Sequence, residues 1–99
     1  SILLPMIKYT KHFLNKLEEF LEKQDYDVRY EKGNFQSGYC LVESNKVVVI
    51  NRFFDTEGRI NNLIEIILQI TIDEKRLEAK DKELLKHLIQ SWESANTEA

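Results

Sequence analysis

The sequence predicts an α+β fold of the order α-β-β-β-α-α: an N-terminal helix, a three-stranded antiparallel meander, and two or three C-terminal helices. Apolar residues recur at helical spacing towards both ends of the chain, whereas a central stretch alternates apolar and polar residues as strands do. The 99 residues include only three glycines and one proline, so most of the chain is expected in regular elements. A chain of this length forms one domain, spanning 1–99, with 1–7 and 95–99 as flexible or added ends.

The first helix is expected over residues 8–24. One face of this stretch is apolar at spacings of three and four residues, which is the pattern of a helix packed on a core. The apolar residues are Phe13, Leu14, Leu17, Phe20 and Leu21. Asp25 and Asp27 then end the helical pattern.

The next stretch predicts a β-hairpin. Residues 26–31 alternate apolar and charged side chains, which is the periodicity of a strand. Gly33 and Asn34 tolerate the positive φ of a tight turn. Residues 35–43 are then expected as a second strand, antiparallel to the first.

A third strand completes the predicted meander. Ser44 and Asn45 form a second turn signal, and residues 46–51 include a β-branched run from Val47 to Ile50. Such a run is typical of a strand that is covered on both faces.

A strongly apolar helix is expected over residues 59–70, with Asp55 or Thr56 as its N-cap. Its polar residues form one narrow stripe, made of Asn61, Asn62, Glu65 and Gln69. Isoleucines and leucines fill the remaining arc of about 200°, which is about twice the width found on an ordinary surface helix. This helix is therefore expected either at the centre of the core or buried on a second side by a partner.

The last helical stretch, residues 74–94, has an apolar face that Asp81 interrupts. Aspartate is common at the start of helices, because its carboxylate accepts hydrogen bonds from unpaired backbone N–H groups. Either the helix breaks near Lys80, or Asp81 caps a second helical segment.

Composition disfavours several classes of partner and location. The net charge is −3, and 14 Lys and Arg are interleaved with 17 Asp and Glu, which argues against nucleic acid or an anionic membrane as the main partner. No apolar run approaches the ~20 residues of a membrane span, and no signal peptide is recognised. Because Cys40 is the only cysteine, no intramolecular disulfide can form, and a cytoplasmic location is expected.

No pattern of residues predicts a metal, a cofactor or an activated nucleophile. His12 and His87 lie far apart on different predicted helices, and neither has a second ligand at the spacing of a zinc site. Cys40 lies in mid-strand and is interpreted as a small buried hydrophobe. The three glycines match no phosphate-binding loop. The question of enzymatic activity is left open, and these observations favour a non-catalytic domain.

The order of one helix, three strands and an apolar helix resembles the minimal core of small zincin-type bacterial metallopeptidases. In that family, the helix after the sheet carries the motif His-Glu-x-x-His. The resemblance places Glu65 at the catalytic glutamate, and it places Ile64 and Leu68 at the two histidines. Because neither of these side chains can bind zinc, the resemblance implies a non-catalytic relative rather than a peptidase.

Residues 37–43 resemble a strand motif of RNA-recognition domains, which runs basic-Gly-aromatic-small-aromatic-Val. Ser37 replaces the basic residue, and Leu41 replaces the second stacking aromatic. Only Tyr39 stands at a stacking position, so single-stranded RNA binding is the third function considered.

The leading hypothesis is a protein-interaction domain that self-associates as a homodimer through its surplus apolar surface. The interface residues predicted for it are Phe53, Phe54, Ile66, Tyr39 and Trp92. Within this set, Ile66 is the residue expected at a dimer seam. The alternative is a small-molecule-binding or enzymatic domain, with a polar site formed by Glu65, Asn62 and Arg52.

Overall fold

The computed structural model describes residues 4–33 and 38–97. Its elements are α1 (Lys11–Lys23), β1 (Asp27–Glu31), β2 (Tyr39–Val42), β3 (Val47–Asn51), α2 (Thr56–Ile67), the short 3-10 helix η1 (Glu74–Arg76) and α3 (Ala79–Thr97). This order confirms the α+β class, with one helix before three strands and further helices after them.

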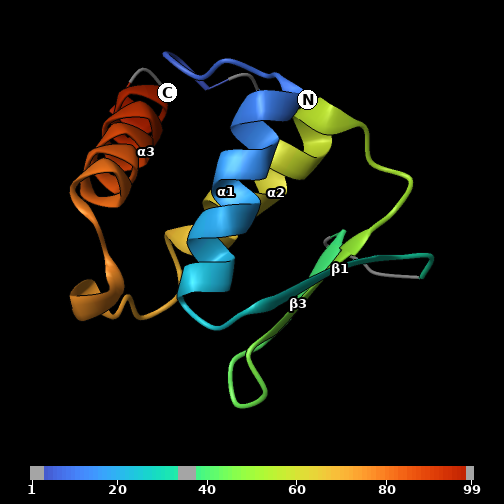
Figure 1. The fold of residues 1–99 in the computed structure, drawn as a ribbon. Coiled ribbons are helices and arrows are strands. Elements are labelled where there is room, and N and C mark those ends of the chain that lie inside the picture. The colour runs from blue at the N-terminus through green and yellow to red at the C-terminus, as the bar shows by residue number, and fades with distance from the viewer. Residues whose placement is uncertain (1–3, 34–37, 98–99) are drawn as a thin grey trace.

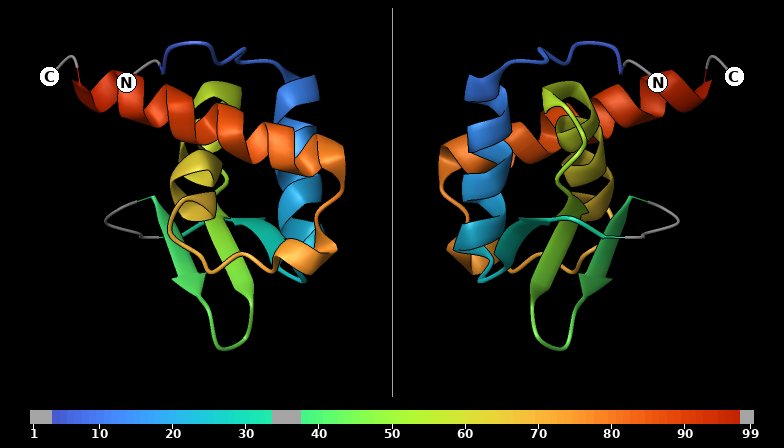
Figure 2. Two further views of the ribbon diagram at one scale, coloured as in Figure 1. Left: turned by 90° about the vertical axis from the view of Figure 1, so that its left-hand side faces the viewer. Right: turned by 90° about the vertical axis from the view of Figure 1, so that its right-hand side faces the viewer.

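The elements form three layers (Figure 1). Helices α1 and α2 lie side by side against one face of the sheet, and α3 crosses both of them on the side away from the sheet (Figure 2). Within the described chain, no helix covers the other face of the sheet (Figure 1). The middle layer is therefore enclosed on two sides, and the core is concentrated there.

The sheet is mixed, so the prediction of a purely antiparallel meander is wrong. Its strand order is β1-β3-β2, with β1 parallel to β3 and β2 antiparallel to β3. Strand β3 has the most β-branched residues of the three strands. In the central position it pairs with a strand on each side, and more of its side-chain surface is buried than at an edge. The charged residues that alternate along β1 suit an edge strand better.

The two predicted turns have different outcomes. The Ser44–Asn45 turn is confirmed, because the Lys46 N–H donates to the Glu43 carbonyl at 3.2 Å and β2 pairs with β3 as a hairpin. The predicted hairpin at Gly33 would have made β1 and β2 neighbours, whereas β3 lies between them. The rest of that prediction, Asn34 of the turn and 35–37 of the second strand, lies outside the described residues.

One face of the sheet packs on the helices. Val48 and Ile50 of β3 have no exposed surface and belong to the same buried cluster as Phe20 of α1 and Ile66 of α2. Val47 and Val49 point to the opposite face and are half-buried. The expectation that this strand is covered on both faces is thus met on one face only.

Both helices of the middle layer begin at the kind of residue that helix capping favours. The Thr10 side chain accepts from the Phe13 N–H at 3.1 Å at the start of α1. The Asp55 side chain accepts from the Gly58 N–H at 2.9 Å at the start of α2, so Asp55 is the N-cap of α2. These contacts confirm both helices and correct their bounds: α1 begins at residue 11 and not at 8, and α2 covers 56–67 and not 59–70.

Helix α2 is the core helix of the domain. Its buried apolar residues, each with 0% exposure, are Ile60, Leu63, Ile64, Ile66 and Ile67. The wide apolar arc is therefore accounted for by the position of α2 between the sheet and α3, and no partner is needed to cover it. Ile66 cannot reach a partner on this fold, which corrects the prediction of Ile66 as an interface residue.

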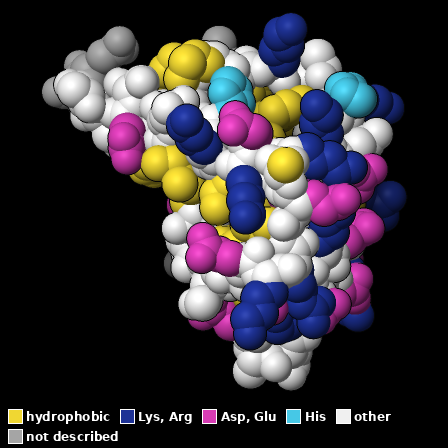
Figure 3. Space-filling view, turned by 60° about the vertical axis from the view of Figure 1, so that its left-hand side comes forward, with side chains coloured by type: hydrophobic (Ala, Val, Ile, Leu, Met, Phe, Trp, Pro, Cys, Tyr) yellow, Lys and Arg dark blue, Asp and Glu magenta, His cyan; other side chains and the backbone are white. Residues whose placement is uncertain are grey.

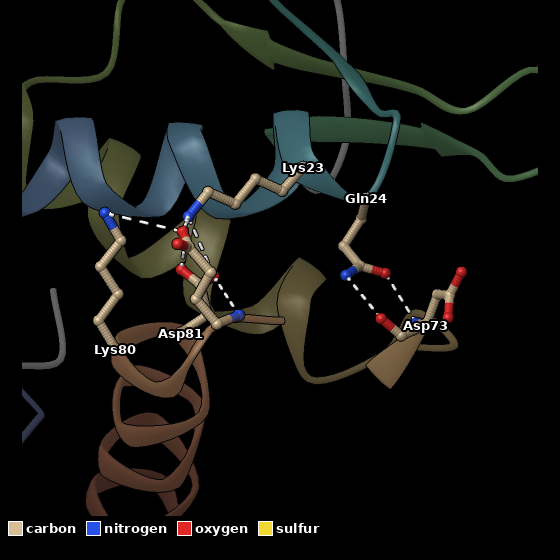
Figure 4. Close-up of polar contacts among 6 residues, drawn as sticks. Lys23, Gln24, Asp73, Lys80 and Asp81 are labelled. Atoms are coloured by element: carbon tan, nitrogen blue, oxygen red, sulfur yellow. Dashed lines mark hydrogen bonds and ion pairs between the residues drawn. The ribbon is translucent and has the colours of Figure 1, made fainter. Parts of the chain in front are cut away.

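The helical stretch breaks at residues 77–78, close to Lys80 as one sequence interpretation expected, and Asp81 lies in the first turn of α3. Its Oδ2 accepts from the Glu78 N–H at 2.9 Å, and the Lys23 ammonium group donates to both carboxylate oxygens at 3.1 and 3.0 Å (Figure 4). The side chain of Asp81 is 8% exposed. Two contacts therefore stabilise this buried carboxylate on an otherwise apolar face. It pairs with the charge of Lys23, and it accepts the Glu78 N–H at the start of α3.

Gln24 joins the end of α1 to the segment that follows α2. Its side-chain amide donates to the Asp73 carbonyl at 3.1 Å and accepts from the Asp73 N–H at 2.8 Å (Figure 4). Gln24 is 2% exposed, so this pair of hydrogen bonds is shielded from water.

Replacing Gln24 with leucine should lower the free energy of unfolding by about 2 kcal/mol, because two backbone groups of Asp73 lose their partners. Urea unfolding followed by circular dichroism measures this loss. The same change at Gln90, which is exposed on α3, should cost less than ~0.5 kcal/mol. Equal losses at the two positions would show that the hydrogen bonds of Gln24 contribute nothing specific.

The segment before α1 is held against the helices. The Ser91 hydroxyl of α3 donates to the Pro5 carbonyl, and His87 Nε2 lies 2.8 Å from the Met6 carbonyl. The Tyr9 hydroxyl accepts from the Leu4 N–H at 2.8 Å and donates to Asn61 Oδ1 at 2.7 Å. Leu4 is consequently 7% exposed, which brings the beginning of the described chain onto α2.

Candidate functional site

A cavity of about 380 Å³ opens where α2, α3 and the segment before α1 meet. We call it the Phe54–Trp92 pocket. Its lining residues are Leu4, Phe54, Gly58, Asn61, Asn62, Glu65 and Trp92. Three residues of the polar stripe, Asn61, Asn62 and Glu65, therefore line this pocket, whereas Gln69 lies beyond the end of α2 and does not.

The aromatic walls of the pocket are partly exposed. Phe54 is 36% exposed and Trp92 is 38% exposed. The Phe54 ring lies over two glycines: a Cβ added to Gly38 would stand 2.5 Å from Phe54 Cε2, and one added to Gly58 would stand 2.6 Å from Phe54 Cδ1. The lack of a side chain at both positions leaves room for the ring at the edge of the pocket.

Asn62 lies at the floor of the pocket with an unused hydrogen-bond donor. Its residue is 9% exposed, and its Nδ2 is buried without a hydrogen-bond partner among the described residues. Such a buried, unpaired donor destabilises a protein by about 1–3 kcal/mol. The atom is covered by its neighbours, so an acceptor in the pocket reaches it only after the Asn62 amide turns towards the cavity.

Glu65 lies on the rim of the pocket, next to Tyr39 and Gln69. The Tyr39 hydroxyl donates to Glu65 Oε1 at 3.1 Å and accepts from Gln69 Nε2 at 2.8 Å. Burial raises the pKa of Tyr39, the Gln69 hydrogen bond opposes this, and the charge of Glu65 adds to the rise. Tyr39 therefore stays protonated at neutral pH, and as a donor it holds the Glu65 carboxylate at the rim.

The pocket unites residues that the sequence assigned to two different hypotheses. Phe54 and Trp92 come from the predicted interface, whereas Asn62 and Glu65 come from the predicted polar site. Tyr39 is connected to them through Glu65.

The remaining predicted residues lie elsewhere. Phe53 is 72% exposed and precedes the pocket residue Phe54, and Ile66 is in the core. Arg52 is exposed in the same turn as Phe53 and does not line the pocket.

Sequence reasoning missed three lining residues. Asn61 belongs to the polar stripe and was recognisable from helical periodicity as a neighbour of Glu65. Leu4 and Gly58 had no such signal. Leu4 reaches the pocket only because the segment before α1 folds across the helix ends (Figure 2).

The described residues that line the pocket include one carboxylate, that of Glu65, and no His or Cys. Residues 4–33 and 38–97 contain no group of three or more His, Cys, Asp or Glu side chains arranged to hold a metal ion. Ile64 is fully buried and Leu68 is half-buried, so the two zincin histidine positions hold apolar, covered side chains. Cys40 is exposed, contrary to its interpretation as a buried residue, and it does not line the pocket.

Single-stranded RNA binding was considered because of the Tyr39 ring. Tyr39 pairs with the inward-facing Ile50, and its hydroxyl is bound by α2 and Gln69, so its ring is turned towards the helices. On the side where α3 lies, Lys and Arg are interleaved with Asp and Glu, and hydrophobic side chains form small separate groups (Figure 3).

No protein-family model matches the chain, and no curated protein or solved structure is significantly similar to it. Nor does any helix in the described part of the chain have both the length and the apolar composition needed to cross a membrane.

Proposed function

We propose that this chain is a non-catalytic protein-interaction domain that binds a segment of a partner in the Phe54–Trp92 pocket. The observation that carries the proposal is the unpaired Nδ2 of Asn62, buried at the floor between partly exposed aromatic walls. A ligand that supplies an acceptor here removes the cost of the unpaired donor, so binding gains a hydrogen bond with little competition from water.

The pocket sets the chemistry of the segment. Phe54 and Trp92 offer aromatic surface, and aromatic side chains dominate the binding energy of many protein interfaces. Asn62 supports a backbone carbonyl of the ligand. Among the described residues that line the pocket, Glu65 alone is charged, and it favours a cation beside the bound apolar side chain.

The size of the pocket is consistent with such a segment. A volume of about 380 Å³ lies at the lower end of the range for ligand sites. It accommodates one large side chain with its backbone amide. We therefore expect recognition of an aromatic residue next to Lys or Arg.

A test starts from peptide display, with the full chain as bait. Peptides that pair an aromatic residue with an adjacent Lys or Arg should be enriched. Trp92 is the only tryptophan and lines the pocket, so titration of a selected peptide should change its fluorescence.

Asn62→Leu provides the sharpest variant. It should weaken peptide binding by about tenfold, because one hydrogen bond is lost. It should also raise the free energy of unfolding by about 1 kcal/mol, because the buried unpaired donor is gone. Asn15→Leu on the exposed face of α1 is the matched control and should change neither quantity. The proposal would be contradicted if the selected peptides lacked an aromatic residue next to Lys or Arg, or if the Asn62→Leu variant bound peptide as tightly as the parent.

Small-molecule binding is the second candidate, and the same unpaired amide favours it. A ligand of this kind would carry an acceptor for Asn62 and an aromatic ring for the walls. Stabilisation of the parent chain by single-ring carbonyl compounds in a thermal-shift screen, with no response from Asn62→Leu and no peptide selected, would favour this function over the first.

A further inference from the structure

The surface of the chain itself displays the motif that the pocket is expected to bind. Phe53 is 72% exposed, the highest value among the large hydrophobic residues of the described chain. It follows the exposed Arg52 in the turn between β3 and α2. Resting on the proposed function, we infer that the partner is a second copy of this chain, whose Arg52–Phe53 turn enters the Phe54–Trp92 pocket.

Charge favours this pairing. The Lys32 ammonium group lies 5.7 Å from the centre of the Phe53 ring, so Phe53 is accompanied by the cations of both Lys32 and Arg52. The pocket that would receive the ring has Glu65 at its rim. An incoming turn with positive charge therefore meets a negative rim, and opposite potentials across an interface favour and orient association.

The turn is held in place before binding. Arg59 donates through Nη2 to the Arg52 carbonyl at 2.9 Å and through Nε to the Phe54 carbonyl at 3.0 Å. The Phe53 N–H donates to Asn51 Oδ1 at 3.2 Å. The Arg59 guanidinium also lies 4.2 Å from the centre of the Tyr30 ring. An ordered turn loses little conformational entropy on binding.

Two copies of the chain can make this contact twice, in a closed dimer with two-fold symmetry. Phe53 projects from the surface next to Phe54, which lines the pocket, so the projecting and receiving groups belong to one patch. When a patch is complementary to itself, a two-fold axis lets each protomer fill the pocket of the other. The result is a closed dimer with two identical contacts, and further copies cannot add.

The first test is the molar mass of the full chain, measured by light scattering from about 10 μM to 1 mM, the range of moderate and weak association. We expect a monomer–dimer equilibrium. Phe53→Ala should raise the dissociation constant by at least about tenfold. Its melting temperature should equal that of the parent at concentrations where both chains are monomeric, because Phe53 is exposed. Ile89→Ala, on α3 and 39% exposed, is the matched control and should leave the dimer intact.

A charge exchange identifies the contact. Arg52→Glu and Glu65→Arg should each weaken the dimer, because like charges would face each other in both contacts. An equimolar mixture of the two variants should dimerise again, since every contact then joins opposite charges.

A monomer throughout the concentration range overturns the inference, as does a dimer that Phe53→Ala leaves unchanged or a mixture that fails to reassociate. Peptide selection tests the proposed function separately. If peptides bind to a monomeric chain, the pocket is an interaction site for another protein and only the self-association is wrong. If the chain neither binds peptides nor dimerises, both proposals fail.

Discussion

Replacement of Ile66 with glutamate should leave the chain unfolded in buffer without denaturant. Ile66 has no exposed surface and lies in the middle of the three layers. A carboxylate at this position would lose its hydration without gaining a partner, at a cost of several kcal/mol. Domains of this size have a total stability of about 5–15 kcal/mol, and the lost packing of isoleucine adds a further ~2–5 kcal/mol.

Far-ultraviolet circular dichroism and a thermal melt measure this outcome. Ile89→Glu is the matched control, because Ile89 is exposed on α3, and its melting temperature should change little. A folded, monomeric Ile66→Glu chain would contradict the core position of Ile66 and restore the interface prediction made from the sequence.

Removal of the Asp81 carboxylate should also destabilise the chain substantially. Asp81→Ala should lower the free energy of unfolding by about 2 kcal/mol at pH 7, because the start of α3 loses its capping group and Lys23 loses a buried partner. Asp81→Asn retains an acceptor for the Glu78 N–H but no charge, so its loss should be smaller. Glu83→Ala, an exposed position on α3, serves as the control.

This effect should depend on pH with a defined sign. Burial acts to raise the pKa of Asp81, but the hydrogen bond from Glu78 and the Lys23 ammonium group outweigh it, so the pKa falls below the ordinary 3.8. The unfolded chain therefore binds this proton more readily than the folded chain does. The contribution of Asp81 is complete above the unfolded pKa and is lost as pH falls through the lower folded value.

Urea unfolding of the parent and Asp81→Ala chains at several pH values checks this expectation. The difference between them should be constant from about pH 6 to 7 and should shrink below about pH 4. A difference that persists unchanged at pH 3 would mean that the carboxylate acts through packing and not through its charge.

Local patterns in the sequence were sufficient to predict that the helices and one turn are present. The apolar spacing of α1, the N-cap at Asp55 and the interruption at Asp81 each depend on residues within a few positions of one another. Helix starts and periodicity are set by such short-range contacts. The Ser44–Asn45 turn belongs to the same class, because a tight turn is determined by the residues that form it.

The sequence identified most residues of the candidate site but did not indicate that they lie close together. Helical periodicity put Asn62 and Glu65 on one stripe, and apolar surplus singled out Phe54 and Trp92. Nothing in the spacing of these residues indicated that the two pairs line one pocket. Leu4 was missed altogether, because its position depends on hydrogen bonds that the segment before α1 makes to α2 and α3.

The sequence by itself determined the α+β class, the element order and the polar stripe of the apolar helix, because these depend on residues close together in the chain. Only the tertiary structure decided the strand order, the burial of Ile66 and the assembly of the pocket. Strand pairing and layer packing join residues that are distant in sequence, and the choice among pairings follows from the total burial that each allows. Placing the β-branched strand β3 at the centre of the sheet, and α2 between two layers, satisfies that requirement.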